Sequence, residues 1–220
     1  MVHAGRGLRV GIPVIGRERV AVLSKEQVRQ DMQAERRRHG GVGGGDPAAV
    51  ARRMVALPCY GAAQVVACYM ALRGEVDLEG LVRARLEARQ SVWLPRFSAP
   101  GQCYEMVLVR SITEDVVPGA FGIREPRAEL PAVPRQEQRG EAVVWWVPGV
   151  AFDPQGQRLG RGRGYYDRLL DGTRGVRVGV AWDWQVLTGL PHAAHDVAMD
   201  WVVTDTRTIA CGGLATAPAE

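Results

Sequence analysis

Short apolar runs of strand length alternate along this chain with segments in which apolar residues recur every three or four positions. Two parallel strands must be joined by a crossover of about a dozen residues or more, which is usually a helix. The alternating order therefore favours a largely parallel sheet with helices on both faces. We expect an α/β protein with strands at 65–72, 92–97, 104–110, 142–152, 176–182 and 201–204.

Local signals mark the helix starts. Ser24 is followed three residues later by Gln27, as in a capping box, and a helix is predicted over 25–38. Asp46 precedes Pro47, which suits the first turn of a second helix. Further helices are expected at 78–89 and 165–172, a flexible loop at the glycine cluster 40–45, and mostly loop at 118–139.

Charge and hydropathy narrow the classes of partner. The net charge of +4 fits a protein that holds anionic ligands, and it also fits weak binding of nucleic acid. Aromatic residues are not interleaved with basic ones as on a single-strand-binding surface. No apolar run approaches the roughly 18 residues that cross a bilayer, so we expect a cytoplasmic protein without a membrane partner. Four cysteines without a CxxC pair are expected to be reduced structural thiols: Cys59, Cys68, Cys103 and Cys211.

The segment 147–170 contains a glycine-rich loop. Its three glycines from Gly160 to Gly164 alternate with two arginines. Glycines let backbone N–H groups converge on phosphate oxygens, and arginines add charge-assisted hydrogen bonds. A Rossmann fingerprint would have glycine where Tyr165 stands, and a Walker A loop would end in Gly-Lys-Ser/Thr. The pattern predicts either a phosphate-binding loop of another kind or a surface loop with solvated arginines.

Four charged residues extend this prediction. Asp167 lies in the first turn of the helix after the loop, where it either favours the helix dipole or holds Mg²⁺ beside phosphates. Asp196 is the second magnesium candidate. Lys25 and Arg29 project from one side of the first helix, where positive charge opposes the macrodipole. They either form a solvated basic face or contact a bound anion.

Ligands of open α/β sheets bind beyond the carboxyl ends of the strands, so the loops after Leu72 and Val147 are the predicted site. Glu75 follows the first of these strands, and it either binds ring N–H groups of a heterocycle or is an ordinary loop residue. His192 and His195 have a spacing that could hold a metal, but the sequence offers no third ligand, so we assign no zinc site.

Taken together, these segments resemble the 5-formyltetrahydrofolate cyclo-ligase family, also called 5,10-methenyltetrahydrofolate synthetases. The resemblance covers residue 25 to about residue 208, so we divide the chain into an N-terminal extension (1–23), a cyclo-ligase domain (24–210) and a C-terminal tail (211–220). The matching segments are KEQVR from Lys25, YMALRGEVD from Tyr69, FGIREP from Phe121, VPGVAFDPQGQRLGRGRGYYDRLL from Val147, and LPHAAHDVAMDWVVTD from Leu190.

The resemblance implies a three-layer α/β/α fold with a central, mostly parallel sheet. It implies an enzyme that uses ATP and Mg²⁺ to convert 5-formyltetrahydrofolate, with or without a polyglutamate tail, into 5,10-methenyltetrahydrofolate, with release of ADP and phosphate. We expect a monomer that does not bind nucleic acid. Two alternatives stay open: a catalytically silent relative that binds folate or nucleotide, and a nucleic-acid-binding protein.

The resemblance also implies roles for residues. Lys25 and Arg161 are expected to neutralise phosphate charge during catalysis, and Asp167 and Asp196 to hold the magnesium ion. The expected ATP-binding residues are Lys25, Arg29, Arg158, Leu159, Gly160, Arg161, Gly162, Arg163, Gly164, Tyr165 and Tyr166. The expected folate-binding residues are Met70, Glu75, Arg161, Gly162, Arg163, Gly164 and Tyr165.

Overall fold

A computed structural model describes residues 24–41, 43–119 and 122–212. The predicted N-terminal extension and most of the predicted tail lie outside the described residues. The described part contains a seven-stranded sheet with the order β11-β10-β9-β6-β1-β2-β3. Neighbours from β10 to β2 are parallel, while β3 and β11 pair antiparallel at the two edges. The strands are β1 (Val65–Ala67), β2 (Ser91–Ser98), β3 (Cys103–Val109), β6 (Val143–Pro148), β9 (Val176–Val180), β10 (Trp201–Val203) and β11 (Thr208–Ala210).

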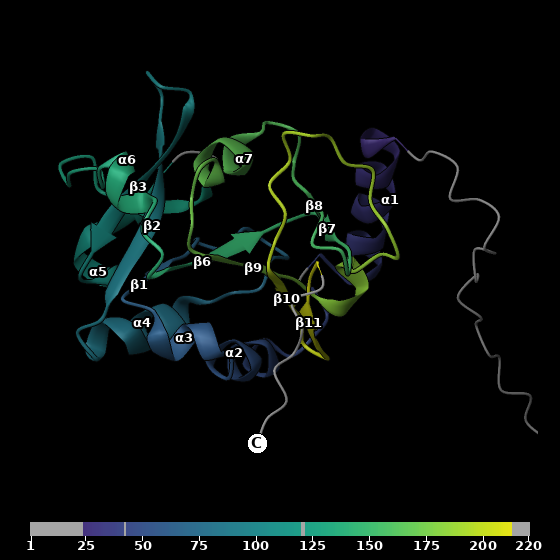
Figure 1. The fold of residues 1–220 in the computed structure, drawn as a ribbon, viewed down its shortest axis with the longest axis horizontal. Coiled ribbons are helices and arrows are strands. Elements are labelled where there is room, and N and C mark those ends of the chain that lie inside the picture. The colour runs from purple at the N-terminus through teal and green to yellow at the C-terminus, as the bar shows by residue number, and fades with distance from the viewer. Residues whose placement is uncertain (1–23, 42, 120–121, 213–220) are drawn as a thin grey trace, which may run out of the picture.

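Helices cover both faces of this sheet. The helices are α1 (Lys25–Arg38), α2 (Pro47–Val55), α3 (Pro58–Ala62), α4 (Glu79–Glu87), α5 (Ile112–Asp115), α6 (Arg135–Gln138), α7 (Tyr165–Leu170) and the 3-10 helix η2 (Asp183–Gln185). Figure 1 shows α2, α3 and α4 along one side of the sheet and α7 on the other. The three-layer α/β fold with a mostly parallel sheet is therefore confirmed. Among the described residues, no helix is long and apolar enough to cross a membrane.

The alternation of side chains along β6 explains the two layers of core. Val144 and Trp146 pack with residues of α2 and α4 on one face. Trp145 and Val147 pack with Leu169 of α7 on the other. Successive side chains of a strand point to opposite faces, so a strand apolar at every position is buried on both sides. The continuous apolar run in the sequence reflects this double burial.

The capping signals are confirmed. The Ser24 hydroxyl accepts a hydrogen bond from the Gln27 backbone N–H at 3.1 Å, and α1 runs from Lys25 to Arg38 as predicted. The Asp46 carboxylate accepts one from the Ala48 N–H at 2.9 Å at the start of α2. Each side chain satisfies a backbone donor that has no partner within the helix, which fixes where the helix begins.

Two predicted strands are shorter than expected. The run 65–72 is strand only as far as Ala67, because both parallel neighbours pair with it only up to that residue. Beyond it the chain stays buried as a loop, in which the Tyr69 hydroxyl donates to the Val76 carbonyl at 2.8 Å. The run 142–152 breaks at Gly149, where a Cβ would lie 2.7 Å from the Phe152 ring.

Short paired segments were not predicted. The antiparallel edge strand β11 is one, and two small hairpins are others: β4 (Val116–Pro118) with β5 (Arg124–Pro126), and β7 (Ala151–Phe152) with β8 (Arg158–Leu159). The β7–β8 hairpin matters for the site, because Val28 and Met32 of α1 pack against Leu159 of this hairpin. This packing sets the position of α1 beside the glycine-rich loop.

The glycine cluster 40–45 has a structural cause besides loop flexibility. A Cβ on Gly43 would lie 2.1 Å from the Trp182 indole, and one on Gly45 would lie 2.6 Å from the same ring. The indole N–H groups of Trp182 and Trp184 donate to the carbonyls of Gly74 and Gly43, at 3.0 and 2.7 Å. The glycines therefore permit close packing of the loop on two tryptophans.

Candidate active site

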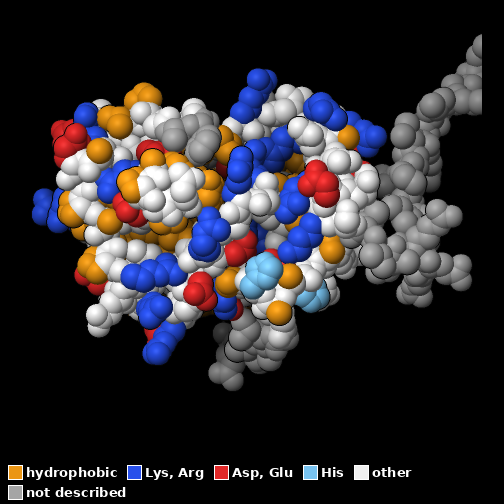
Figure 2. Space-filling model, turned by 90° about the horizontal axis from the view of Figure 1, so that it is seen from above, with side chains coloured by type: hydrophobic (Ala, Val, Ile, Leu, Met, Phe, Trp, Pro, Cys, Tyr) orange, Lys and Arg blue, Asp and Glu red, His pale blue; other side chains and the backbone are white. Residues whose placement is uncertain are grey.

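A pocket of about 1070 Å³ opens where the loops after β1 and β6 leave the sheet. Leu72 and Glu75 line it from the first loop, and Pro148 and Gly149 from the second. This is the location predicted from the carboxyl ends of the strands. Every site residue named from the sequence lines this one pocket: Lys25, Arg29, Met70, Glu75, Arg158 to Tyr166 in sequence, Asp167 and Asp196. Figure 2 shows basic side chains gathered across the middle of the face that lies on top in Figure 1.

The first turns of α1 supply two cations to the pocket. Lys25 Nζ lies 2.5 Å from an Asp196 carboxylate oxygen, and Arg29 Nε donates to the Gly160 carbonyl at 3.0 Å. Since Val28 and Met32 are buried against the β7–β8 hairpin, Lys25 and Arg29 are held at its edge. The positive charge at the start of this helix thus faces the site and is not spread over a solvated surface.

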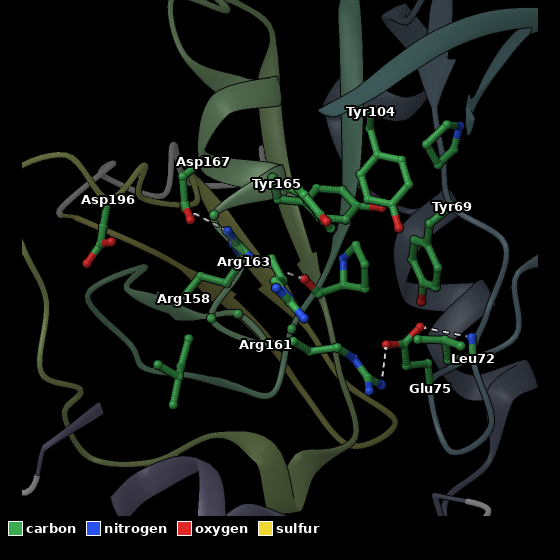
Figure 3. Close-up of a pocket in the computed structure, with 18 of the residues that line it drawn as sticks. Tyr69, Leu72, Glu75, Tyr104, Arg158, Arg161, Arg163, Tyr165, Asp167 and Asp196 are labelled. Carbon is green, nitrogen blue, oxygen red and sulfur yellow. Dashed lines mark hydrogen bonds and ion pairs between the residues drawn. The ribbon is translucent and has the colours of Figure 1, made fainter. Parts of the chain in front are cut away.

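The glycine-rich loop forms another wall. Gly162 and Gly164 have positive φ angles of 93° and 64°, which only glycine adopts readily. A Cβ on Gly162 would lie 3.4 Å from the Arg29 guanidinium, so the loop and α1 are in close contact. Arg161 extends from the loop across the pocket to Glu75, at 3.2 Å (Figure 3).

Arg158 differs from its expected role as an open phosphate ligand. Its side chain is only 3% exposed, and Nη2 lies 2.7 Å from an Asp167 carboxylate oxygen. The guanidinium also lies 5.5 Å from the centre of the Tyr166 ring. In this arrangement Arg158 holds Asp167 in place, and its role as an ATP contact stays a prediction.

Aromatic side chains form the wall opposite the magnesium candidates. The rings of Phe97, Tyr104 and Tyr165 meet one another with centroid distances of 5.2 to 6.0 Å. The sequence reasoning missed Phe97 and Tyr104. They face each other across the β2–β3 pair, which the alternation in those two strands could have indicated once their register was known. Pro95, Gln102, Ile123 and Glu125 also line the pocket and were missed.

Glu75 lies at the inner end of the pocket. Its carboxylate is 9% exposed and accepts a hydrogen bond from the Leu72 backbone N–H at 3.0 Å. Burial, followed by the nearby Glu75 charge, raises the pKa values of Tyr69 and Tyr166 well above their ordinary value. Both phenols are therefore neutral hydrogen-bonding groups over the whole physiological range.

Asp196 is held as a carboxylate. Burial alone would raise its pKa, but hydrogen bonds from Lys25 and from the Ala193 backbone N–H outweigh that effect and lower it. His195 lines the pocket with its Nε2 3.8 Å from Asp196, whereas His192 is not among the lining residues.

The donor set was compared with the needs of metal ions. Within the described ranges, no group of three His, Cys, Asp or Glu side chains could hold a metal ion. Zinc sites need three or four such ligands, whereas Mg²⁺ is commonly held by one or two carboxylates together with substrate phosphates. Figure 3 shows Asp167 and Asp196 on the same side of the pocket, away from Glu75. Two carboxylates beside a basic, glycine-rich loop fit a magnesium ion that arrives with phosphates.

Comparisons with known proteins agree with this geometry. Residues 21–205 match the model of the 5-formyltetrahydrofolate cyclo-ligase family. A 5-formyltetrahydrofolate cyclo-ligase of Mycolicibacterium smegmatis is 36% identical over 151 residues, which are 66% of this chain and 76% of that protein. The one of Escherichia coli K12 is 31% identical over 160 residues, 71% and 86% of the two chains. The NMR structure of Aquifex aeolicus 5,10-methenyltetrahydrofolate synthetase aligns with a TM-score of 0.72 and 32% identity, covering 90% of this chain and 97% of that one.

Proposed function

This chain belongs to the 5-formyltetrahydrofolate cyclo-ligase family, and on that premise we propose that it uses ATP to convert 5-formyltetrahydrofolate into 5,10-methenyltetrahydrofolate, with release of ADP and phosphate. One observation carries the proposal. A single pocket joins a basic, glycine-rich end with two carboxylates to an aromatic end with a buried glutamate. The first end suits a nucleoside triphosphate and the second suits a pterin with its aminobenzoyl ring.

The nucleotide is proposed to lie along residues 158–166, with its phosphates toward α1. Lys25 and Arg29 would supply positive charge there, and the flexible backbone of Gly162 and Gly164 would bring N–H groups to the phosphate oxygens. The charge of Lys25 is now neutralised by Asp196. Phosphates would take over Lys25, so that Asp196 becomes available for a cation.

The folate is proposed to occupy the other end of the pocket. Glu75, 9% exposed, can accept hydrogen bonds from amino and ring N–H groups of a pterin. Met70 lines this end, and the rings of Phe97, Tyr104 and Tyr165 offer stacking or edge contacts to the aminobenzoyl ring. Arg161, which now pairs with Glu75, lies between the two ends and would turn to the phosphates when the pterin binds.

The proposed chemistry is phosphoryl transfer followed by ring closure. The formyl oxygen on N5 attacks the γ-phosphorus of ATP and ADP leaves, so that an iminium phosphate forms. N10 then attacks the formyl carbon, the ring closes, and the C–O bond breaks with release of phosphate. No protein nucleophile is needed, and the enzyme acts by positioning both substrates and stabilising charge. Lys25 and Arg161 are the side chains assigned to the charge on the transferring phosphoryl group.

Asp167 and Asp196 are proposed to hold Mg²⁺ together with the ATP phosphates. When bound, the ion would neutralise charge on the β- and γ-phosphates. Arg158 keeps Asp167 in position from below the loop, because its buried guanidinium donates to that carboxylate. Lys25 and the Ala193 N–H do the same for Asp196.

We also propose that the chain acts as a monomer in the cytoplasm, on 5-formyltetrahydrofolate with or without a polyglutamate tail. All four cysteines are free thiols, which is usual in a reducing compartment. One chain supplies every lining residue of the pocket described above.

A turnover assay tests the proposed function. Purified protein is mixed with 5-formyltetrahydrofolate, ATP and Mg²⁺, and formation of the methenyl chromophore is followed by absorbance. We expect product that depends on ATP and equals the ADP released. A folded protein that binds both substrates and forms no product would instead be a silent relative of the family.

A further inference from the structure

Asp153 is a buried carboxylate that the proposed chemistry does not use. It lies in the turn between β7 and β8 and is 2% exposed. Its Oδ1 accepts hydrogen bonds from the backbone N–H groups of Gln155 and Gln157, at 3.0 and 2.9 Å. Its Oδ2 accepts one from the N–H of Leu190, 37 residues later in the chain, at 2.9 Å. One side chain thus joins the β7–β8 turn to a distant segment.

That distant segment, 187–199, carries Asp196. The Leu187 N–H donates to the Phe152 carbonyl at 2.9 Å, next to the Asp153–Leu190 contact. At its other end, the Met199 N–H donates to the Gly156 carbonyl at 2.8 Å. Both ends of the segment are therefore fixed to the same short turn.

Close backbone packing strengthens the second tie. Gly156 has a φ of +87°, and a Cβ there would lie 2.3 Å from the Met199 carbonyl oxygen. The turn is followed directly by β8, whose Arg158 holds Asp167. The β7–β8 turn is thus connected to the carriers of both magnesium candidates.

We propose that Asp153 is a positioning residue for the magnesium site: it sets the distance of the Asp196 segment from the glycine-rich loop. This inference rests on the proposed function, because it takes Asp167 and Asp196 as the magnesium ligands. Groups that orient metal ligands from behind commonly change metal affinity or activity about 10- to 100-fold when they are removed. Asp153 acts from the far side of the segment and does not line the pocket.

The variant Asp153→Asn separates the two jobs of this carboxylate. An asparagine has the same shape but only one oxygen acceptor and an NH₂ donor. With its oxygen toward Gln155 and Gln157 it keeps two hydrogen bonds of the turn, and its NH₂ group then faces the Leu190 N–H, donor against donor. The opposite orientation would lose two bonds in place of one, so the tie to the Asp196 segment is the one that breaks.

Asp200→Asn is the matched control. The Asp200 Oδ2 also accepts from two donors, the N–H and Nε of Arg177, while its Oδ1 accepts from Nη2 of the same residue. The same substitution therefore loses the same kind of contact at a carboxylate four residues after Asp196. Asp200 does not line the pocket either.

The measurement is calorimetric binding of a non-hydrolysable ATP analogue at increasing Mg²⁺, with binding of 5-formyltetrahydrofolate measured separately. For Asp153→Asn we expect the Mg²⁺ concentration for half-maximal nucleotide binding to rise about tenfold or more. Folate affinity should stay within about twofold of the original protein, and Asp200→Asn should behave like the original protein. An unchanged Mg²⁺ requirement, or an equal rise in both variants, would overturn the inference.

If Asp153→Asn does not fold, Leu187→Pro weakens the same tie. Proline removes the N–H that bonds the Phe152 carbonyl, and Val186 before it is already extended, with φ −94° and ψ 110°, as a residue before proline prefers. The same rise in Mg²⁺ requirement is expected, and its absence would contradict the inference. Nucleotide binding by the original protein that ignores Mg²⁺ would refute the magnesium assignment in the proposed function, and the inference with it.

Discussion

At the residue scale, the charged side chains of the pocket are arranged in three ion pairs. Lys25 pairs with Asp196, Arg158 with Asp167, and Arg161 with Glu75. A substrate that takes one member of a pair leaves the other member to a second ligand. Charges are thus kept partnered before binding, which avoids the cost of an unpaired charge with little access to water.

The Arg158–Asp167 pair predicts different results for two substitutions of Asp167. Arg158 is nearly buried, so Asp167→Ala leaves its guanidinium without the acceptor at 2.7 Å, whereas Asp167→Asn keeps an oxygen there. We expect the alanine variant to unfold at a free energy about 1–3 kcal/mol lower than the asparagine variant, measured by urea denaturation. Both variants should lose turnover, because neither supplies a carboxylate for Mg²⁺. Turnover by Asp167→Asn at the original rate would disprove the magnesium role.

Lys25→Met removes a positive charge assigned to the ATP phosphates. We expect kcat/KM for ATP to fall by about two to three orders of magnitude, by analogy with the loss of one donor to a transition-state anion. Arg37→Met is the control, since Arg37 is exposed on the same helix and does not line the pocket. Steady-state kinetics distinguish the two, and equal losses would mean that only net charge matters.

At the element scale, what could be predicted depended on how local the signal was. The starts of α1 and α2 were found because Ser24 and Asp46 cap their own helices. The end of β1 was misplaced because the loop after Ala67 is as buried as a strand, so its apolar run has no local mark of the change. Tyr104 and Phe97 were missed as pocket residues because strand register, not composition, brings them together.

The η2 helix supplies a pH-dependent tie to the turn between β10 and β11. The Asp183 carboxylate accepts hydrogen bonds from the Thr204 hydroxyl at 2.9 Å and from Arg207 Nε at 2.7 Å. Burial alone would raise the pKa of Asp183, but hydrogen bonds from Thr206, Thr204 and Arg207 lower it below its ordinary value. The folded protein therefore binds a proton at this site less readily than the unfolded chain.

It follows that the tie stabilises the fold fully above the unfolded pKa of about 3.9 and is lost as the pH falls through the lower folded pKa. Replacement by asparagine removes this dependence. We expect Asp183→Asn to be less stable than the original protein by a constant amount between about pH 7 and about pH 5, and the gap to narrow below about pH 4. Unfolding free energies measured along this pH series check it, and a gap that widens in acid would contradict it.

At the scale of the whole molecule, the pocket gathers residues from α1, from the loop after β1, from the glycine-rich loop and from the segment before β10. Residue types and local spacing predicted that each segment could bind an anion, a cation or a heterocycle. They could not place Lys25 beside Asp196 across 171 positions, because that contact depends on the packing of α1 against the β7–β8 hairpin. The family resemblance linked these segments before the structure did.

Removal of metal should affect catalysis and leave the fold unchanged. No cluster of three metal-binding side chains exists among the described residues, so no metal is expected to hold the structure together. With a chelator, we expect turnover to stop while the melting temperature without substrates stays the same. Addition of Mg²⁺ and ATP should raise the melting temperature, since both bind the folded state. A large fall in melting temperature with chelator alone would indicate a structural metal.

The central claim is that one pocket brings the formyl oxygen of the folate to the γ-phosphate of ATP. Substrate carrying a heavy oxygen isotope in its formyl group tests this most directly, with the released phosphate analysed by mass spectrometry after a single turnover. Because the C–O bond breaks on ring closure, each phosphate released should carry one heavy oxygen atom. Product formed with unlabelled phosphate, and with the label in water, would contradict direct transfer between the two substrates in this pocket.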